Sequence, residues 1–183
     1  RDSAIGGFFF YFLKKGFENL KESKRVSKAI NTNTQIFENL VTLRATLDCD
    51  RVKMFQFFNG DYYTTGQSTL KMHMTYCSVK AGVSFPEGFI YSEAVPVSRV
   101  SHILKPLIEE DSFSIYSSDM DNCEWQASDN LNGTVFSLFV RIGPPGSIHG
   151  VIVCSYTRMD EIKEYQIAFA KEIASVISAL MGS

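Results

Sequence analysis

Apolar residues recur every three or four positions through the first quarter of the chain. The segment 17–47 is rich in Lys, Glu, Leu, Asn, Thr and Ala and holds neither proline nor glycine. Such a repeat places apolar side chains on one face of an α-helix, so the pattern predicts a helix over residues 17–47. The polar insert 31–34 could divide this helix in two, because short amide and hydroxyl side chains compete for backbone hydrogen bonds.

Beyond residue 50 apolar and polar positions alternate, which is the pattern of a β-strand. Residues 51–58 predict a first strand that ends at the turn signal Asn59-Gly60-Asp61. The elements expected next are a strand at 70–79, a loop at 82–88, a short helix at 97–108 perturbed by Pro106, a strand at 113–116 and a polar, acidic loop at 117–133.

The last third of the chain carries the strongest local signal. Residues 134–141 and 148–156 are rich in β-forming residues and are joined by Gly143-Pro144-Pro145-Gly146-Ser147. These turn residues predict a hairpin with antiparallel pairing. Residues 160–181 then predict a long helix with an apolar stripe that repeats every seven positions.

The order of these elements predicts an α+β fold. Strands that follow one another between terminal helices favour an antiparallel β-sheet with N- and C-terminal helices packed on one face, preceded by an extended N-terminal helix. We expect three segments: a hydrophobic N-terminal segment at 1–16 that anchors or docks, a basic helical linker at 17–34 and a folded domain at 35–183.

Charge is unevenly placed along the chain. The net charge is −2, yet residues 14–28 hold six Lys or Arg against two Glu and so carry +4, which leaves −6 for the remainder. The apolar run 4–13 directly precedes this stretch and is too short to cross a bilayer, for which about 20 residues are needed. An apolar segment with a cationic flank is typical of contact with an anionic membrane interface. A helix start that docks on a partner subunit is the alternative.

The residues expected at such a membrane or docking contact are Phe8, Phe9, Phe10, Tyr11, Phe12, Lys14 and Lys15. The near-neutral total gives no indication of nucleic-acid binding. Because the chain begins with Arg1, we expect a fragment or a processed form.

Residues that could carry chemistry are sparse. The four cysteines show no CxxC spacing, which fits a reducing, cytoplasmic setting, and three of them lie in apolar or strand-like contexts where a free cysteine packs as a small apolar residue. His73 and Cys77 lie four apart in a predicted strand and would share a face, but no further ligand follows at a usable spacing, so no metal is expected. No nucleophile elbow and no phosphate-binding glycine loop are present in the sequence. We therefore expect neither an enzyme nor a cofactor.

Residues 35–181 resemble a GAF domain, a fold related to PAS domains. The matching pieces are the helix-to-strand junction 47–52, the helix-to-strand step 107–116 and the strands 135–142 and 148–153 followed by a terminal helix. Residues 55–60 are also similar to a GAF-like group of phages and bacteria in which a hydrophobic segment precedes the domain. That second resemblance implies a tether on the cytoplasmic face of a membrane, or a place in a virion.

The resemblance implies a non-enzymatic sensory or regulatory module that binds a small ligand or forms dimers through its terminal helices. The alternative is a structural or assembly protein, such as a phage-encoded one, docked on a membrane or a larger complex. A pocket lined by aromatic and histidine side chains is expected from Tyr62, Tyr63, His73, Tyr76, Phe85, Phe89, Tyr91, His102, Tyr116 and Trp125, although the same residues could simply fill the core. A homodimer interface is expected from Phe37, Leu40, Ile162, Phe169, Ile173, Val176 and Leu180.

Overall fold

A six-stranded antiparallel sheet forms the centre of the domain in the computed structural model, which describes residues 3–62, 65–121, 123–158 and 161–182. The strand order is β3-β2-β1-β6-β5-β4, and each pair of neighbours is antiparallel. The strands are β1 (Arg51–Tyr62), β2 (Ser68–Val79), β3 (Val95–Pro96), β4 (Ser112–Tyr116), β5 (Phe136–Ile142) and β6 (Gly150–Tyr156). The predicted α+β class with an antiparallel sheet is confirmed.

The chain divides into two compact units, residues 1–36 and 37–183. The first unit consists of the larger part of helix α1 (Ser3–Leu47), and the second holds the end of α1 and all other elements. The expected break at residues 31–34 is absent, because helix α1 runs through them. The Oγ1 hydroxyl of Thr34 donates to the carbonyl oxygen of Ile30 at 2.9 Å, so this side chain bonds back within the helix and leaves its backbone pattern intact.

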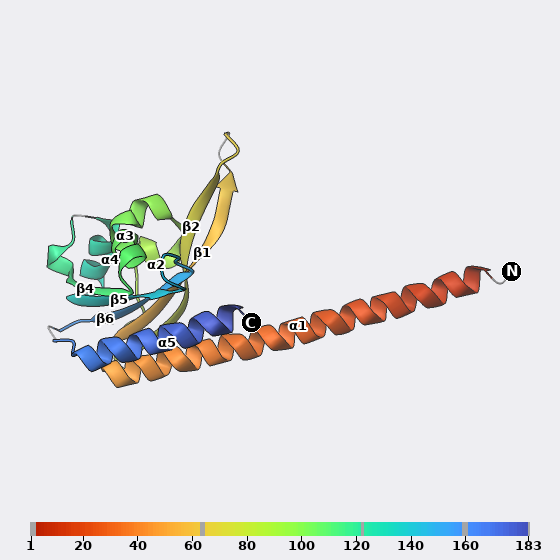
Figure 1. Cartoon of the computed structure of the whole chain (residues 1–183), viewed down its shortest axis with the longest axis horizontal. Helices are drawn as coiled ribbons and strands as arrows, with labels where there is room; N and C mark the ends of the chain where they lie inside the picture. Colours follow the sequence, from red (N-terminus) through yellow and green to blue (C-terminus); the bar gives the residue numbers. More distant parts are fainter. Residues whose placement is uncertain (1–2, 63–64, 122, 159–160, 183) are drawn as a thin grey trace. The chain divides into compact units, whose positions relative to one another are not determined.

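Helices cover both faces of the sheet in the second unit. Helix α5 (Glu164–Gly182) packs against β5, and it lies on the same side as the last turns of α1 (Figure 1). The opposite face carries the short helices α2 (Phe89–Ser92), α3 (Ser101–Glu109) and α4 (Glu124–Leu131), with single 3₁₀ turns η1 (Val97–Val100) and η2 (Ser117–Asp119) (Figure 1). The terminal helices therefore share one face of the sheet, as predicted.

Helix α4 corrects the expectation that residues 117–133 form only a polar loop. The Sγ atom of Cys123 accepts a hydrogen bond from the backbone N–H of Gln126 at 3.4 Å and so caps the first turn. Trp125 is 1% exposed and fixes the helix to the sheet. An eight-residue helix with few apolar residues leaves too weak a repeat to recognise in sequence, and tertiary packing of its one large side chain decides its formation.

A β-bulge overturns the expectation that His73 and Cys77 share a face. In the pairing of β1 with β2, Cys77 lies opposite Lys53 and His73 lies opposite Gln56, with a register shift between Met54 and Phe55. An extra residue in one strand of a pair reverses the alternation beyond it. His73 and Cys77 therefore face opposite sides of the sheet.

The predicted hairpin is present as β5 and β6, two inner strands of the sheet. All seven residues of each strand are buried. Gly143 opens the connecting turn with φ +128°, and the N–H of His149 donates to the carbonyl oxygen of Ile142 at 2.7 Å to close it. A Cβ atom on Gly143 would lie 2.7 Å from the carbonyl oxygen of Ser147, so the turn requires glycine at this position.

Candidate functional site

The face of the sheet beneath α2, α3 and α4 is filled by aromatic side chains. Trp125 and Tyr91 are 1% and 4% exposed. The ring centroids of Phe55 and Trp125 are 5.2 Å apart, and those of Trp125 and Phe139 are 5.3 Å apart. Rings at such distances pack in direct contact. Of the ten residues expected to line a pocket here, the structure brings Tyr91 and Trp125 together, and it places them in the core.

The other expected pocket residues are scattered. His73, Tyr76 and Tyr116 are half-buried, whereas Tyr62, Phe85, Phe89 and His102 are exposed; Tyr63 lies outside the described residues. His73 lines a cavity of about 500 Å³ beside β1 and β2, together with Gln56, Phe57, Phe58, Thr75 and Ala94. Phe89 lines a different cavity, beside α2 and α4, so His73 and Phe89 do not share one cavity.

A buried polar network lies within the aromatic core. The Nζ ammonium of Lys53 donates to the hydroxyl of Tyr91 at 3.0 Å, and that hydroxyl donates to the Oδ1 atom of Asp129 at 3.2 Å. The Oγ hydroxyl of Ser117 donates to Oδ2 of the same carboxylate at 3.1 Å. Lys53 and Asp129 are 1% and 0% exposed. The network joins β1 to α2, α4 and the start of η2.

Burial shifts the pKa value of each titratable group in this network in the direction that favours its neutral form. Desolvation lowers the pKa of Lys53, and the nearby negative charge of Asp129 opposes that shift. Desolvation raises the pKa of Asp129, against the opposing charge of Lys53 and the hydrogen bonds from Ser117 and Tyr91. The pKa of Tyr91 is raised by burial and by Asp129. Because neither charged group reaches solvent, the network is suited to holding elements together.

The pairing of Lys53 with Asp129 was not predicted from the sequence. One signal was present: in a strand that alternates, Arg51 and Lys53 fall on the same face as Phe55. A charged residue at an inward position needs a buried partner. For Arg51 this partner is backbone, since its Nε donates to the carbonyl oxygen of Ser84 at 2.9 Å.

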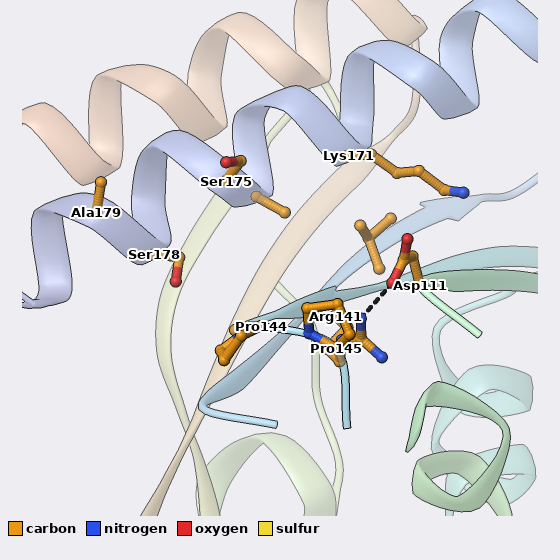
Figure 2. A pocket seen from close by; sticks show the side chains of 11 residues that line it. Asp111, Arg141, Pro144, Pro145, Lys171, Ser175, Ser178 and Ala179 are labelled. Carbon is orange, nitrogen blue, oxygen red and sulfur yellow. Dashed lines mark hydrogen bonds and ion pairs between the residues drawn. The ribbon is translucent and has the colours of Figure 1, made fainter. Parts of the chain in front are cut away.

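An open cavity of about 480 Å³ lies between the β5–β6 turn and α5 (Figure 2). From the sheet side it is lined by Asp111, Val140, Arg141, Gly143, Pro144 and Pro145, and from α5 by Lys171, Ala174, Ser175, Ser178 and Ala179. The side chain of Arg141 is 3% exposed and forms an ion pair with Asp111. Its Nη1 donates to the carbonyl oxygen of Leu107 at 3.0 Å, near the end of α3. None of these residues was expected at a site.

The residues expected at a dimer interface divide by exposure. Leu40 and Ile173 are buried within the second unit, and Ile162, Phe169 and Leu180 are half-buried. Phe37 and Val176 are 44% and 42% exposed, so they are available to a partner.

The expected membrane contact falls largely outside the described part of the chain. The side chains of Phe8, Phe9, Phe10, Tyr11, Phe12 and Lys14 are not among those described, and Lys15 is exposed. Of the helices searched, none combines the length and apolar character needed to span a bilayer. Among the residues that the structure describes, no group of three His, Cys, Asp or Glu side chains lies close enough to hold a metal ion.

Comparison with known proteins gives a consistent fold. No protein-family model and no curated protein matches the chain. Among solved structures, the phycocyanobilin-bound GAF domain of a cyanobacterial phytochrome is 13% identical with a TM-score of 0.62, over 87% of this chain and 88% of that one. The PixJ GAF domain of Thermosynechococcus elongatus is 18% identical with a TM-score of 0.63, over 85% and 87% of the two chains.

A GAF domain of a two-component sensor histidine kinase from Bacillus halodurans is 16% identical, with a TM-score of 0.59 over 81% of this chain and 92% of that one. Sequence identities this low indicate a shared fold but do not indicate a shared ligand. The strand order, the helices on both faces and these likenesses together show that the chain has a GAF-like fold.

Proposed function

We propose that this chain is a non-catalytic regulatory module of the sensory type, which acts through self-association of its terminal helices. The observation that carries the proposal is the exposure of Phe37 on α1 and Val176 on α5, two large apolar side chains on helices that lie on the same face of the sheet. Fully burying an apolar side chain contributes about 1.5–3 kcal/mol. Because Phe37 and Val176 are already more than half buried, a second copy would gain roughly half of that from each, so they would form the centre of a larger interface.

The solved structures support the sensory part of this proposal. They include a bilin-bound phytochrome domain and a domain of a sensor histidine kinase, both of which belong to signalling proteins. The packed core beneath α2, α3 and α4 supports a role that does not require a catalytic cavity there, because its charged groups, Lys53 and Asp129, are shielded from solvent.

Mass in solution tests self-association directly. We expect the full chain to sediment as a dimer at tens of micromolar, and Phe37→Asp with Val176→Asp to convert it to a monomer, because two charges would be buried in the interface. Leu131→Asp is the matched control: Leu131 is 65% exposed on α4, across the sheet, so its replacement should leave the mass unchanged. A monomeric wild-type chain, or a dimer that both aspartates leave intact, would refute the proposal.

A second candidate function is assembly on an anionic membrane through the first unit. Lys21, Lys24 and Arg25 are exposed on α1 and follow the apolar run 4–13 in sequence. Each basic residue near an anionic surface contributes about 1 kcal/mol. We expect the chain to co-sediment with vesicles of phosphatidylserine and phosphatidylcholine, and to lose most of that binding when the three residues are changed to Glu.

Deletion of residues 1–16 separates the apolar contribution from the charged one, and pure phosphatidylcholine vesicles serve as the uncharged control. Equal binding to both kinds of vesicle would contradict the charge-dependent contact. No binding to either would contradict the membrane version and leave a protein partner as the docking surface.

A further inference from the structure

Arg141 is a buried cation with an unused donor. Its Nη1 donates to the carbonyl oxygens of Leu107 and Ile108 at 3.0 and 3.3 Å, and its Nη2 donates to Asp111. Its Nε is buried and has no hydrogen-bond partner among the residues described. Buried N–H groups almost always have an acceptor, from protein, water or ligand. Arg141 lines the cavity beside α5. Its Nε has almost no accessible surface, so a molecule bound there can supply that acceptor only when neighbouring side chains shift.

The opposite wall of the cavity adds further donors. Lys171, Ser175 and Ser178 are spaced four and three residues apart, so they project from one side of α5. Figure 2 shows this wall across from Arg141 and the two prolines of the β5–β6 turn. Arg141 and Lys171 against Asp111 give the lining a net charge of +1. The cavity therefore offers cationic and hydroxyl donors to an anion.

The remaining lining is apolar and made of small or rigid side chains. Pro144 and Pro145 lie on the turn, and Ala174 and Ala179 lie on α5. Small side chains on the helix leave a volume of about 480 Å³. Pockets for small molecules are typically about 300–1,000 Å³, mostly apolar, with a few polar groups that fix orientation. An inorganic ion alone would leave most of this cavity unfilled.

We propose that the cavity between the β5–β6 turn and α5 binds a small organic anion. Its carboxylate or phosphate group is held by the Nε of Arg141 with Lys171 and Ser178, and its apolar body packs against the prolines and alanines. The site lies beside α5, away from the aromatic core beneath α2, α3 and α4. It goes beyond the proposed self-association, and its test does not depend on the mass of the particle.

A competing arrangement needs no ligand. The side chain of Asp111 is 56% exposed, so it can turn and present both oxygens to Nε and Nη2 of Arg141. The guanidinium would then be fully paired within the chain. In that case an organic anion would gain nothing at Arg141, and any preference of the cavity for a charged probe would rest on Lys171 alone.

A titration followed by ¹H–¹⁵N NMR of the full chain separates the two arrangements. The probes are benzoate and phenyl phosphate, with acetate and inorganic phosphate as anions without an apolar body and benzamide as the uncharged match. We expect benzoate or phenyl phosphate to cause saturable shifts of the amides of residues 141–143, 146–147 and 171–179, with affinity roughly tenfold above that of benzamide. The stronger of the two identifies a carboxylate or a phosphate ester as the ligand class.

Variants on α5 carry the mutational test, because Arg141 also binds the end of α3 and its replacement would disturb the fold. Lys171→Glu should lower the affinity for the preferred probe roughly tenfold, and Ser178→Leu should abolish binding of the probe because the larger side chain fills the cavity. Lys163→Glu makes the same charge change at an exposed position before α5 and should leave affinity unchanged. Equal binding of benzamide, absence of saturable shifts at these amides, or equal weakening by the two glutamates would overturn the proposal.

Discussion

Removing one charge from the buried network should cost far more than removing both. Lys53 and Asp129 are joined through the hydroxyl of Tyr91, at 3.0 Å on one side and 3.2 Å on the other. The two charges are therefore at most about 6 Å apart, and at that separation they attract by roughly 3 kcal/mol at an effective dielectric constant of 20. Asp129→Asn or Lys53→Met alone should therefore destabilise the fold by about 3–5 kcal/mol, since each leaves the other charge buried without its partner.

The double variant tests whether this cost belongs to the pair. Replacing both members of a buried ion pair is often close to neutral, so Lys53→Met with Asp129→Asn should lie within about 2 kcal/mol of wild type. The interaction free energy from the double-mutant cycle would then be at least about 4 kcal/mol. Urea unfolding measures all four proteins, and Trp125, the single tryptophan, reports on the core that surrounds the network.

The dependence on pH has opposite signs for the two single variants. The pKa of Lys53 in the folded state lies below 10.5, its value in the unfolded chain. At any pH between the folded and the unfolded pKa the unfolded state binds more protons, so stability rises with pH in that window. Losing Asp129 lowers the folded pKa of Lys53 further, so the deficit of Asp129→Asn should shrink as pH rises from 7 toward 10.

The reverse holds for the acid. The pKa of Asp129 in the folded state lies above 3.8, its value in the unfolded chain. At any pH between the unfolded and the folded pKa the folded state binds more protons, so stability falls as pH rises in that window. Without Lys53 that folded pKa rises further, and the deficit of Lys53→Met should shrink as pH falls from 7 toward 5. Deficits that stay constant with pH, or single costs that simply add in the double variant, would show that Lys53 and Asp129 are not a charged pair.

Three further predictions concern the core, a thiol and the turn. Trp125→Ala should lower the free energy of unfolding by about 3–5 kcal/mol, measured by circular dichroism, because it empties the centre of the aromatic cluster; a cost below 1 kcal/mol would contradict that packing. Burial raises the pKa of Cys77 from 9.0 to about 11, so its alkylation by iodoacetamide at pH 8 should be roughly 100-fold slower than in urea, as peptide mass mapping would show. Gly143→Ala should cost about 1–3 kcal/mol because of its φ of +128° and the close Ser147 carbonyl, whereas Gly182→Ala, with no atom within 4 Å, should be neutral or stabilising.

The alternation of apolar and polar residues and the turn residues were sufficient to predict the central hairpin of the sheet, and the apolar stripe was sufficient to predict the last helix. The hairpin of β5 and β6 follows from two β-rich runs joined by glycines and prolines, and the helix of residues 164–182 follows from its seven-residue stripe. These signals are local, since each depends on residues that are close in the chain. Helix α4 carries no such repeat, and it forms because Trp125 reaches the sheet.

The sequence by itself determined the α+β class, the antiparallel pairing and the terminal helices, because side-chain periodicity dictates which face of each element avoids water. Only the tertiary structure decided the sites. A single bulge in β2 sends His73 and Cys77 to opposite faces, and Asp129 meets Lys53 only because α4 packs over β1. The cavity at Arg141 likewise depends on where α5 crosses the β5–β6 turn. Such contacts join residues that are distant in the chain, so they cannot be predicted from the local pattern of apolar and polar residues.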